Sequence, residues 1–258
     1  MHAIVTAGGI PTPKDALYAF TKGMPKALLS VAGKPMIQWV INALNESDAI
    51  TNVIITGLPP FTEIISRHPL TILPSQGDIV NNIRAGVDEI HRTEPDVDKT
   101  LLISSDIPAI HPEMVNWMVK IVKDTDADIY YNVISRQVME SSFPGSKRTY
   151  TRFKEVEVCG GDLNAMRLSL LTSDNPFFHQ IIDSRKNPFK QASLFGFDIL
   201  FLLLLNQLTL QEAEKKISER LKAKGSVILC PFAEIGMDID KPNQFEMVQN
   251  YMKKQLSK

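Results

Sequence analysis

The sequence predicts an α/β protein built around a mostly parallel, doubly wound sheet. Short apolar runs of four or five residues alternate with longer segments in which apolar residues recur every three or four positions. Some runs are apolar throughout, which is typical of strands buried on both faces of a sheet. Strands and helices that alternate in this order favour parallel βαβ units, with ligands bound at the carboxyl ends of the strands.

The first half of the chain supplies the repeating units. Pro35 would occupy the first turn of a helix, where its fixed φ angle and missing N–H are tolerated. Residues 77–91 show clear helical spacing, because Ile79, Ile83 and Val87 would share one face. The expected strands are 3–6, 52–56, 70–73, 100–104 and 127–133, and the expected helices are 35–44, 77–91 and 112–123.

The pattern changes after residue 135. Residues 141–149 (SSFPGSKRT) predict a turn-rich, basic loop, and residues 150–158 alternate like an exposed strand. The chain from 175 to 224 is expected to be helical, with Gly225 as its C-cap. A last strand (226–230) and a closing helix (242–256) follow. We therefore expect one domain over residues 1–258, in which a helical lobe is inserted into the half that follows residue 135.

Composition excludes several classes of protein. The formal net charge is -1, which gives no bulk electrostatic basis for binding nucleic acid. Two unpatterned cysteines, Cys159 and Cys230, predict neither a disulfide framework nor a metal site, and a reducing cytoplasm is the default. The apolar run 199–205 falls short of the roughly 20 residues that span a bilayer, so we expect a buried helix. The oligomeric state is not predicted.

Paired glycines directly follow the first strand. Backbone N–H groups at Gly8 and Gly9 can cradle phosphates, although a plain strand–loop junction would look the same. Lys26 lies in the segment that returns toward this turn. Its ammonium group could neutralise a phosphoryl group in transfer, or it could simply be solvated.

Carboxylates follow two other predicted elements. Asp106 comes just after strand 100–104, at the sheet edge where Gly8 and Gly9 are expected. Mg²⁺ prefers one or two carboxylates together with substrate phosphates, and capping of a helix is the alternative role. Asp238 and Asp240 precede the closing helix. We expect only one of them, Asp240, to face the site, and a capping role for Asp240 stays open.

Three stretches together resemble the MobA-like nucleotidyltransferase family. They are TAGG…GMPKALLSVAGKPMIQWVINAL, LLISSDIPAI and EIGMDIDKPNQFE, which occur in the order that the family shows. The resemblance covers about residues 3–135 and the terminal aspartate motif. It implies a GT-A-like, Rossmann-related fold and transfer of a nucleotide from an NTP, with GTP or CTP favoured, to a phosphorylated small molecule. Pyrophosphate would be released.

The resemblance also implies roles for particular residues. Lys26 and Asp106 would be catalytic, and Mg²⁺ would bind Asp106 and Asp240. The stretch PSQGDIVNNIRAG resembles the family's base-reading segment, although polar residues at a helix start would give the same pattern. The implied nucleotide-binding residues are Ala7, Gly8, Gly9, Lys26, Ser75, Gln76, Gly77 and Asn82.

Two further stretches, FPGSKRTYTRFKEVEVCGGDLNAM and SRKNPF, resemble a narrower subgroup of uncharacterised MobA-like proteins. In the family this region faces the acceptor substrate. Basic side chains could hold an acceptor phosphate, and Arg185 and Lys186 would add positive charge. The implied acceptor-binding residues are Lys147, Arg148, Arg152, Gly161, Asp162 and Asn164.

One departure from the family pattern keeps other functions open. Relatives commonly have a compact glycine loop with an arginine that grips the triphosphate, whereas residues 10–25 form a longer stretch without arginine. Lys14 or Lys22 could take the place of that arginine. The alternatives are a nucleotide-binding or regulatory module without turnover, and a GT-A glycosyltransferase that uses a nucleotide sugar, since Asp238-Ile239-Asp240 is a D-x-D string.

Overall fold

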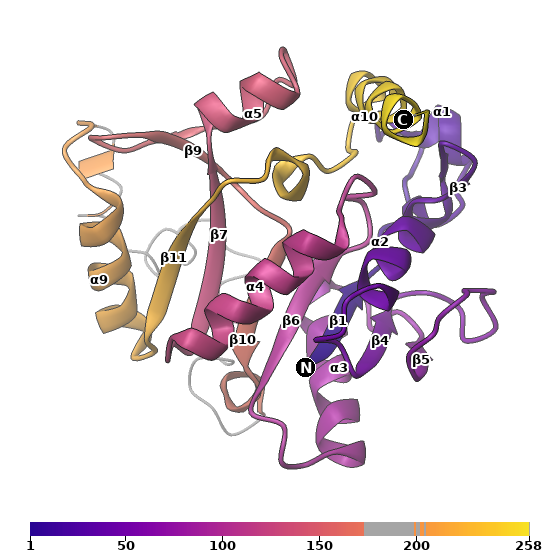
Figure 1. Cartoon of the computed structure of the whole chain (residues 1–258), viewed down its shortest axis with the longest axis horizontal. Coiled ribbons are helices and arrows are strands. Elements are labelled where there is room, and N and C mark those ends of the chain that lie inside the picture. The colour runs from indigo at the N-terminus through magenta and orange to yellow at the C-terminus, as the bar shows by residue number, and fades with distance from the viewer. Residues whose placement is uncertain (173–198, 200–201, 204, 258) are drawn as a thin grey trace.

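The computed structural model describes residues 1–172, 199, 202–203 and 205–257. In this part of the chain, nine strands form one mixed sheet in the order β5-β4-β1-β6-β10-β7-β9-β8, and β11 pairs with β7 (Figure 1). The strands of the sheet are β1 (His2–Thr6), β4 (Asn52–Thr56), β5 (Leu70–Leu73), β6 (Lys99–Ser104), β7 (Ile129–Ser135), β8 (Thr151–Arg152), β9 (Glu157–Gly160), β10 (Leu163–Arg167) and β11 (Gly225–Cys230).

The mostly parallel sheet is confirmed. Strands β5, β4, β1 and β6 are parallel neighbours, and β7 is parallel to β11. Strand β10 runs antiparallel to both β6 and β7, so it joins two parallel groups that share one direction. The residues that follow β1, β4 and β6 therefore leave the sheet at the same edge.

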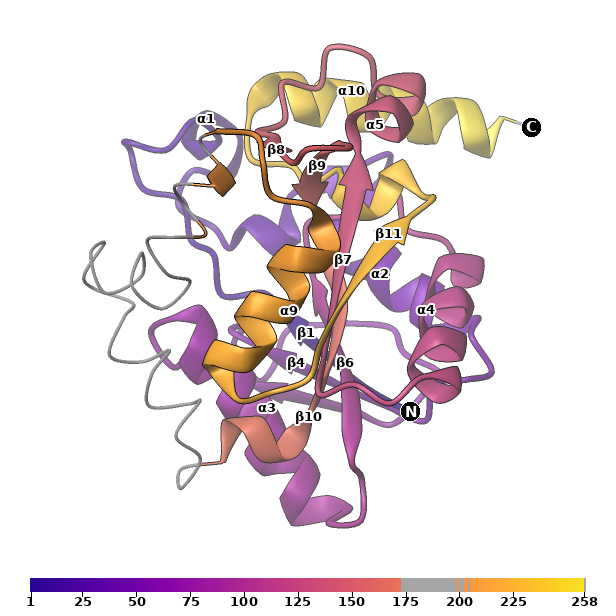
Figure 2. The ribbon, with the colours of Figure 1, turned by 90° about the vertical axis from the view of Figure 1, so that its left-hand side faces the viewer.

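Helices cover both faces of the sheet, as Figure 2 shows for α3 and α9 on one side and α4 on the other. The helices are α1 (Tyr18–Thr21), α2 (Met36–Asn45), α3 (Ile79–Thr93), α4 (Pro112–Asp124), α5 (Arg136–Ser142), α9 (Leu210–Leu221) and α10 (Pro242–Leu256). Short 3-10 turns lie at Lys26–Leu28, Leu168–Leu171 and Ala233–Gly236, and Ser30–Val31 pairs with Lys34–Pro35 as a separate hairpin, β2 and β3.

Strand β1 shows why its three central residues are all apolar. Ala3 and Val5 belong to the core shared with α2 and α4, whereas Ile4 belongs to the core on the α3 side, and all three are fully buried. Successive side chains of a strand point to opposite faces. A helix layer on each face therefore requires apolar residues at both alternating sets of positions.

The expected elements of the first half are present with small shifts. Helix α3 begins at Ile79, because the Asp78 side chain accepts a hydrogen bond from the Asn81 N–H and caps the helix. The expected apolar face is interrupted at its first residue, since Ile79 is 62% exposed. The strand expected at 127–133 occupies Ile129–Ser135 instead.

Several expectations for the second half are wrong in detail. The strand expected at 150–158 is two short antiparallel strands, β8 and β9. Gly225 begins β11, and Lys222 is the C-cap of α9, with a left-handed φ of 50°. Most of the expected helical lobe, including Arg185 and Lys186, lies outside the described residues, as does part of the apolar run 199–205. No helix in the described ranges is long and apolar enough to cross a membrane.

One close approach of two glycines holds β4 against the turn after β1. Gly57 follows β4 with a φ of 105°, and a Cβ atom there would lie 2.3 Å from the backbone nitrogen of Gly8. Both the backbone angle and the space therefore require glycine.

We expect Gly57→Ala to lower the free energy of unfolding by about 3 kcal/mol or more, because left-handed strain and a backbone clash add. Gly33→Ala is the matched control. Gly33 has a φ of 88°, but a Cβ atom added there would have no other atom within 4 Å, so roughly 1–2 kcal/mol of strain is expected. Urea unfolding of the two variants measures the difference. Equal losses would show that the contact between the two backbones does not restrict the fold.

Candidate active site

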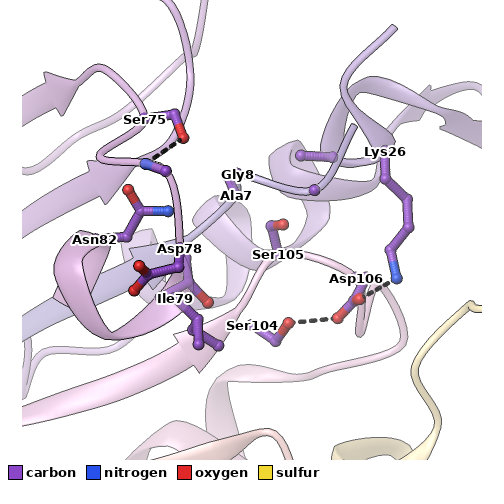
Figure 3. A pocket seen from close by; sticks show the side chains of 14 residues that line it. Ala7, Gly8, Lys26, Ser75, Asp78, Ile79, Asn82, Ser104, Ser105 and Asp106 are labelled. Carbon is purple, nitrogen blue, oxygen red and sulfur yellow. Dashed lines mark hydrogen bonds and ion pairs between the residues drawn. The ribbon is translucent and has the colours of Figure 1, made fainter. Parts of the chain in front are cut away.

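A pocket opens at the sheet edge where β1 and β6 end (Figure 3). The parallel register pairs Thr6 with Ser104, and the Ser105 N–H donates to the Thr6 carbonyl at 3.0 Å. The residues that follow the two strands therefore lie side by side, as expected. The lining residues are Thr6, Ala7, Gly8, Gly9, Lys26, Ala27, Ser75, Gly77, Asp78, Ile79, Asn82, Ser104, Ser105 and Asp106.

Glycine occurs at positions 8 and 9 for different structural reasons. A Cβ atom on Gly8 would lie 2.6 Å from the Asn82 side-chain nitrogen, so close packing of the pocket wall requires glycine there. At Gly9 the nearest atom to a Cβ would be 4.0 Å away, on Lys26, and the Gly9 carbonyl accepts from the Lys26 N–H at 2.8 Å. Gly9 therefore leaves bare backbone facing open space, where a ligand can approach closely.

The loop before α3 forms the opposite wall. Asn82 is 4% exposed, and its Oδ1 atom accepts from the Gln76 N–H at 2.7 Å. The Ser75 hydroxyl accepts from the Gly77 N–H at 3.3 Å, and Gly77 has a φ of 92°. The Gln76 side chain turns back to the Pro74 carbonyl and does not line the pocket. These contacts fix the loop shape, and the Asn82 side chain also lines the pocket beside Gly8.

Ile79 lines the same pocket and was not expected there. Its side chain is 62% exposed although it begins an otherwise amphipathic helix. An apolar residue directly after a helix N-cap, on the loop that faces a ligand, was the available signal in the sequence. Its exposed surface gives a flat ligand group something apolar to pack against.

The Lys26 ammonium group bridges two carboxylates. Its Nζ atom lies 2.5 Å from Asp106 Oδ2 and 2.5 Å from Asp240 Oδ1. Burial lowers the pKa of Lys26, but Asp106 and Asp240 outweigh it, so the pKa is raised above its ordinary value. Lys26 therefore stays charged at neutral pH.

Neither aspartate is used as a helix cap, the alternative that the sequence left open. Helix α4 begins at Pro112 with His111 as its N-cap, and the Asp106 side chain accepts from the Ser104 hydroxyl at 2.5 Å instead. The N-cap of α10 is Lys241, without a side-chain capping bond. Asp106 lines the pocket, and Asp240 lines a neighbouring cavity that shares Lys26 with it.

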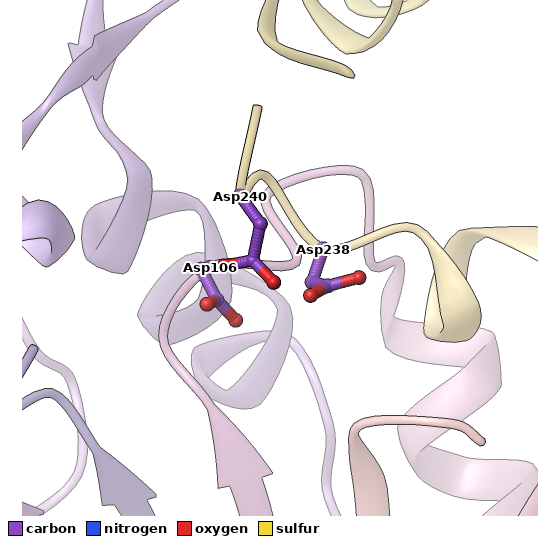
Figure 4. Close-up of side chains that lie close together, drawn as sticks. All are labelled: Asp106, Asp238 and Asp240. Carbon is purple, nitrogen blue, oxygen red and sulfur yellow. The ribbon is translucent and has the colours of Figure 1, made fainter. Parts of the chain in front are cut away.

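Asp238 joins them, against expectation. Carboxylate oxygens of Asp106, Asp238 and Asp240 lie within 4.8 Å of one another (Figure 4). Residues two apart in extended backbone share a face, so the expectation that only Asp240 would face the site was wrong. Ile239, between them, is fully buried on the other side. Three converging carboxylates match the oxygen ligands that Mg²⁺ prefers, and Lys26 shows that positive charge is accommodated there.

The basic residues expected to meet an acceptor do not gather. Arg148 reaches the carboxylates and forms an ion pair with Asp238, and the two side chains are 15% and 14% exposed. Lys147 is exposed, and the Arg152 side chain is 68% exposed with Glu157 as its partner at 4.0 Å. Of the three, only Arg148 therefore lies beside the cluster.

Of the other three residues expected to bind the acceptor, two have structural contacts and one lies near the cluster. Gly161 is packed against the core, because a Cβ there would lie 2.9 Å from Ile134. The Asn164 side chain bonds the Gly161 carbonyl and the Asn132 N–H, both at 2.8 Å. Asp162 differs, because burial and the nearby Asp106 carboxylate raise its pKa to about 7. Asp162 therefore senses the charge of the cluster.

The stretch 10–25 contains the short helix α1 and lies beside Lys26. A second cavity is lined by Gly9, Ile10, Pro11, Asp15, Ala16, Leu17, Lys26 and Asp240. Lys14 and Lys22 are exposed and are not among these residues. Of the described residues that line this cavity, Lys26 is the one cation.

The fold is an α/β protein with a mostly parallel sheet, and the pocket lies at the carboxyl ends of parallel strands, where such folds usually bind their ligands. Residues 3–177 match the family model of the MobA-like NTP transferase domain, so the chain belongs to that family. The resemblance seen in the sequence is confirmed, and nucleotidyl transfer is the general activity that family and fold support. No curated protein matches the chain.

Solved structures agree with this fold. A hypothetical transferase from Thermus thermophilus has a TM-score of 0.80 and 29% identity, covering 95% of this chain and 98% of that one. CMP:2-keto-3-deoxy-manno-octonic acid synthetase in complex with CTP has a TM-score of 0.58 and 15% identity, covering 98% and 99%. For 4-diphosphocytidyl-2C-methyl-D-erythritol synthase the values are 0.57 and 9%, covering 97% of both chains. The last two likenesses show the fold alone.

We expect Asp162 to make stability depend on pH. Its folded-state pKa of about 7 lies above the ordinary 3.8, so between these values the folded protein holds a proton that the unfolded chain has lost. The free energy of unfolding therefore falls as pH rises through this window, by about 1.4 kcal/mol per pH unit at most. Asp162→Asn removes this loss. The free energy of unfolding of the variant minus that of wild type should therefore increase from pH 5 to 7 and level off above about 8.

Urea unfolding in EDTA at several pH values measures this difference. Asp126→Asn is the control, because Lys99 lowers the pKa of Asp126 and moves its titration below the window. Its difference from wild type should not change between pH 5 and 8. An Asp162→Asn difference that is equally flat would contradict the assignment.

Proposed function

We propose that the protein is an Mg²⁺-dependent nucleotidyltransferase that transfers NMP from an NTP to a phosphorylated small molecule and releases pyrophosphate. The observation that carries the proposal is the contact of Lys26 with Asp106 and Asp240 at the edge of the glycine-lined pocket. A buried ammonium beside carboxylates suits a site where phosphate charge and a divalent cation meet. The single-domain organisation is part of the same proposal, with the acceptor on the side of residues 136–258.

The pocket supports binding of a nucleotide in one orientation. The loop of residues 75–77 would contact the base, because Ser75 and Asn82 lie on the opposite side of the pocket from Asp106 (Figure 3), and the exposed Ile79 side chain would add an apolar contact. Bare backbone at Gly8 and Gly9 would lie along the phosphates, which then reach Lys26. CTP and GTP are the favoured nucleotides, in line with the CTP complex of the structurally similar synthetase.

The reaction follows from the groups at the site. An oxygen of the acceptor phosphate attacks the α-phosphorus, a new P–O bond forms there, and the bond to the bridging oxygen of the β-phosphate breaks as pyrophosphate leaves. The acceptor phosphate is already ionised at neutral pH, so no general base is required. This agrees with the lining of the pocket, where the described residues include neither histidine nor cysteine.

Protein side chains supply the positive charge that the transfer needs. Lys26 would stabilise charge that develops on the phosphates, and Arg148 would hold the acceptor phosphate. Mg²⁺, held by Asp106 and Asp240, would add Lewis-acid neutralisation of the triphosphate. Lys147 and Arg152 are too exposed for a fixed contact, and we assign them attraction of the anionic acceptor from solution.

We expect Lys26→Met and Asp106→Asn each to lower the rate of pyrophosphate release by about 10²–10³-fold, the usual effect of removing one charge-stabilising group. The assay combines the four NTPs, Mg²⁺ and a panel of phosphorylated acceptors. Lys253→Met, an exposed lysine on α10, is the control and should keep the wild-type rate. Wild-type rates in the first two variants would refute the assigned roles.

The same assay separates the alternative functions. NTP binding without turnover on any acceptor would favour a regulatory module, and sugar release from a nucleotide sugar would favour a glycosyltransferase.

Thermal unfolding should identify the nucleotide independently of the acceptor. A ligand at 100 times its Kd stabilises the folded state by about 2.7 kcal/mol, or roughly 5–10 °C in Tm for a chain of this size. We expect CTP or GTP with Mg²⁺ to give such a shift and Asn82→Ala to abolish it. If all four NTPs gave the same shift, the loop of residues 75–77 would not read the base.

A further inference from the structure

Every carboxylate of the candidate metal cluster is paired with a side-chain cation. Lys26 contacts Asp106 and Asp240, and Arg148 pairs with Asp238. These two cations leave one negative charge uncompensated among the three carboxylates. A divalent ion at the three carboxylates would compete with these two side-chain cations for the same oxygens. The competition is strongest at Asp238, because Asp238 and Arg148 are only 14% and 15% exposed, whereas the Asp240 side chain is 55% exposed.

Arg148 is the cation whose present contacts are least complete. Its Nε atom is buried and has no hydrogen-bond partner among the described residues, although the guanidinium group forms an ion pair with Asp238 and a hydrogen bond with the Cys159 side chain. A buried ion pair repays its desolvation only when its hydrogen bonds are satisfied. By contrast, Lys26 contacts two carboxylates at 2.5 Å each.

The geometry of the guanidinium group indicates which ligand could replace Asp238 as the partner of Arg148. Its planar fork can bind a phosphate through two parallel hydrogen bonds, and the Nε atom without a partner is free to form one of them. Lys147 precedes it with a left-handed φ of 54°, after the fully buried Ser146. This backbone directs Arg148 inward while Lys147 is exposed.

We propose that Arg148 is exchanged between Asp238 and the acceptor phosphate, and that its departure makes Asp238 a third carboxylate ligand of the metal. This inference rests on the proposed function. Before the acceptor binds, Arg148 blocks Asp238 and the metal site is incomplete. When a phosphate takes the guanidinium, Asp238 turns to the metal. Thermodynamic linkage requires the converse, so a bound metal also strengthens phosphate binding at Arg148.

Calorimetric titration of the metal-free protein with Mn²⁺ tests the exchange without any catalytic readout. In Arg148→Gln the Asp238 carboxylate is free, so Mn²⁺ should bind about tenfold more tightly than in wild type. Asp238→Asn should not bind Mn²⁺ more tightly. In the double variant the gain should disappear, because the carboxylate that Arg148 had blocked is absent. Arg136→Gln, which breaks an arginine–glutamate pair with Glu157 instead, should leave the Mn²⁺ affinity within twofold of wild type.

A second titration adds inorganic phosphate, with Mn²⁺ kept below the concentration that precipitates. Phosphate should tighten Mn²⁺ binding several-fold in wild type and in Arg136→Gln, but not in Arg148→Gln. Arg148→Lys keeps the charge against Asp238 and loses the fork, so its Mn²⁺ affinity should match wild type while the phosphate effect falls. This variant keeps the test decisive if Arg148→Gln folds poorly.

The outcomes separate the two proposals. If wild type binds Mn²⁺ and NTP but Arg148→Gln binds Mn²⁺ no more tightly, the exchange is refuted and the proposed function stands. A gain in Arg148→Gln that persists in the double variant also refutes it, because Asp238 would not be the ligand released. If wild type binds neither Mn²⁺ nor NTP, both proposals fail.

Discussion

The contact of Lys26 with Asp106 and Asp240 is the interaction on which the site depends. It joins three segments that are far apart in the chain: the 3-10 turn Lys26–Leu28, the end of β6 and the approach to α10. Because the ammonium stays charged when buried between the carboxylates, the three segments are drawn to one point at the sheet edge.

This contact is possible because the sheet places its strand ends with little freedom. The parallel register of β1 and β6 brings the glycine turn beside Ser105, and the close approach of Gly57 to Gly8 fixes the neighbouring strand end. The Asn82 side chain then packs on Gly8 from the other wall. Backbone geometry thus determines the shape of the pocket, and side-chain charge determines what it can bind.

The sequence predicted those parts of the site that follow strands. Gly8 and Asp106 directly follow apolar runs, so their shared edge was predictable from strand order alone. The pairing of Arg148 with Asp238 was not, because it joins two irregular segments whose approach depends on tertiary packing. Ile79 was assigned to an apolar helix face, but the N-cap at Asp78 turns the first residue of α3 toward the pocket. Spacing within a helix does not reveal where its terminus opens onto a ligand site.

Charge also explains how the chain can lack an arginine in residues 10–25. A triphosphate and a divalent ion bring opposite charges, so their order of binding depends on which side-chain charges are already paired. Carboxylates hold both cations, and in the proposed exchange Arg148 leaves Asp238 for the acceptor phosphate. Lys26 lines both the main pocket and the cavity beside residues 10–17, so its charge already lies at the region where relatives place the arginine. Under the proposed function, the acidic cluster would therefore hold the metal and also keep the two cations in place for the phosphates.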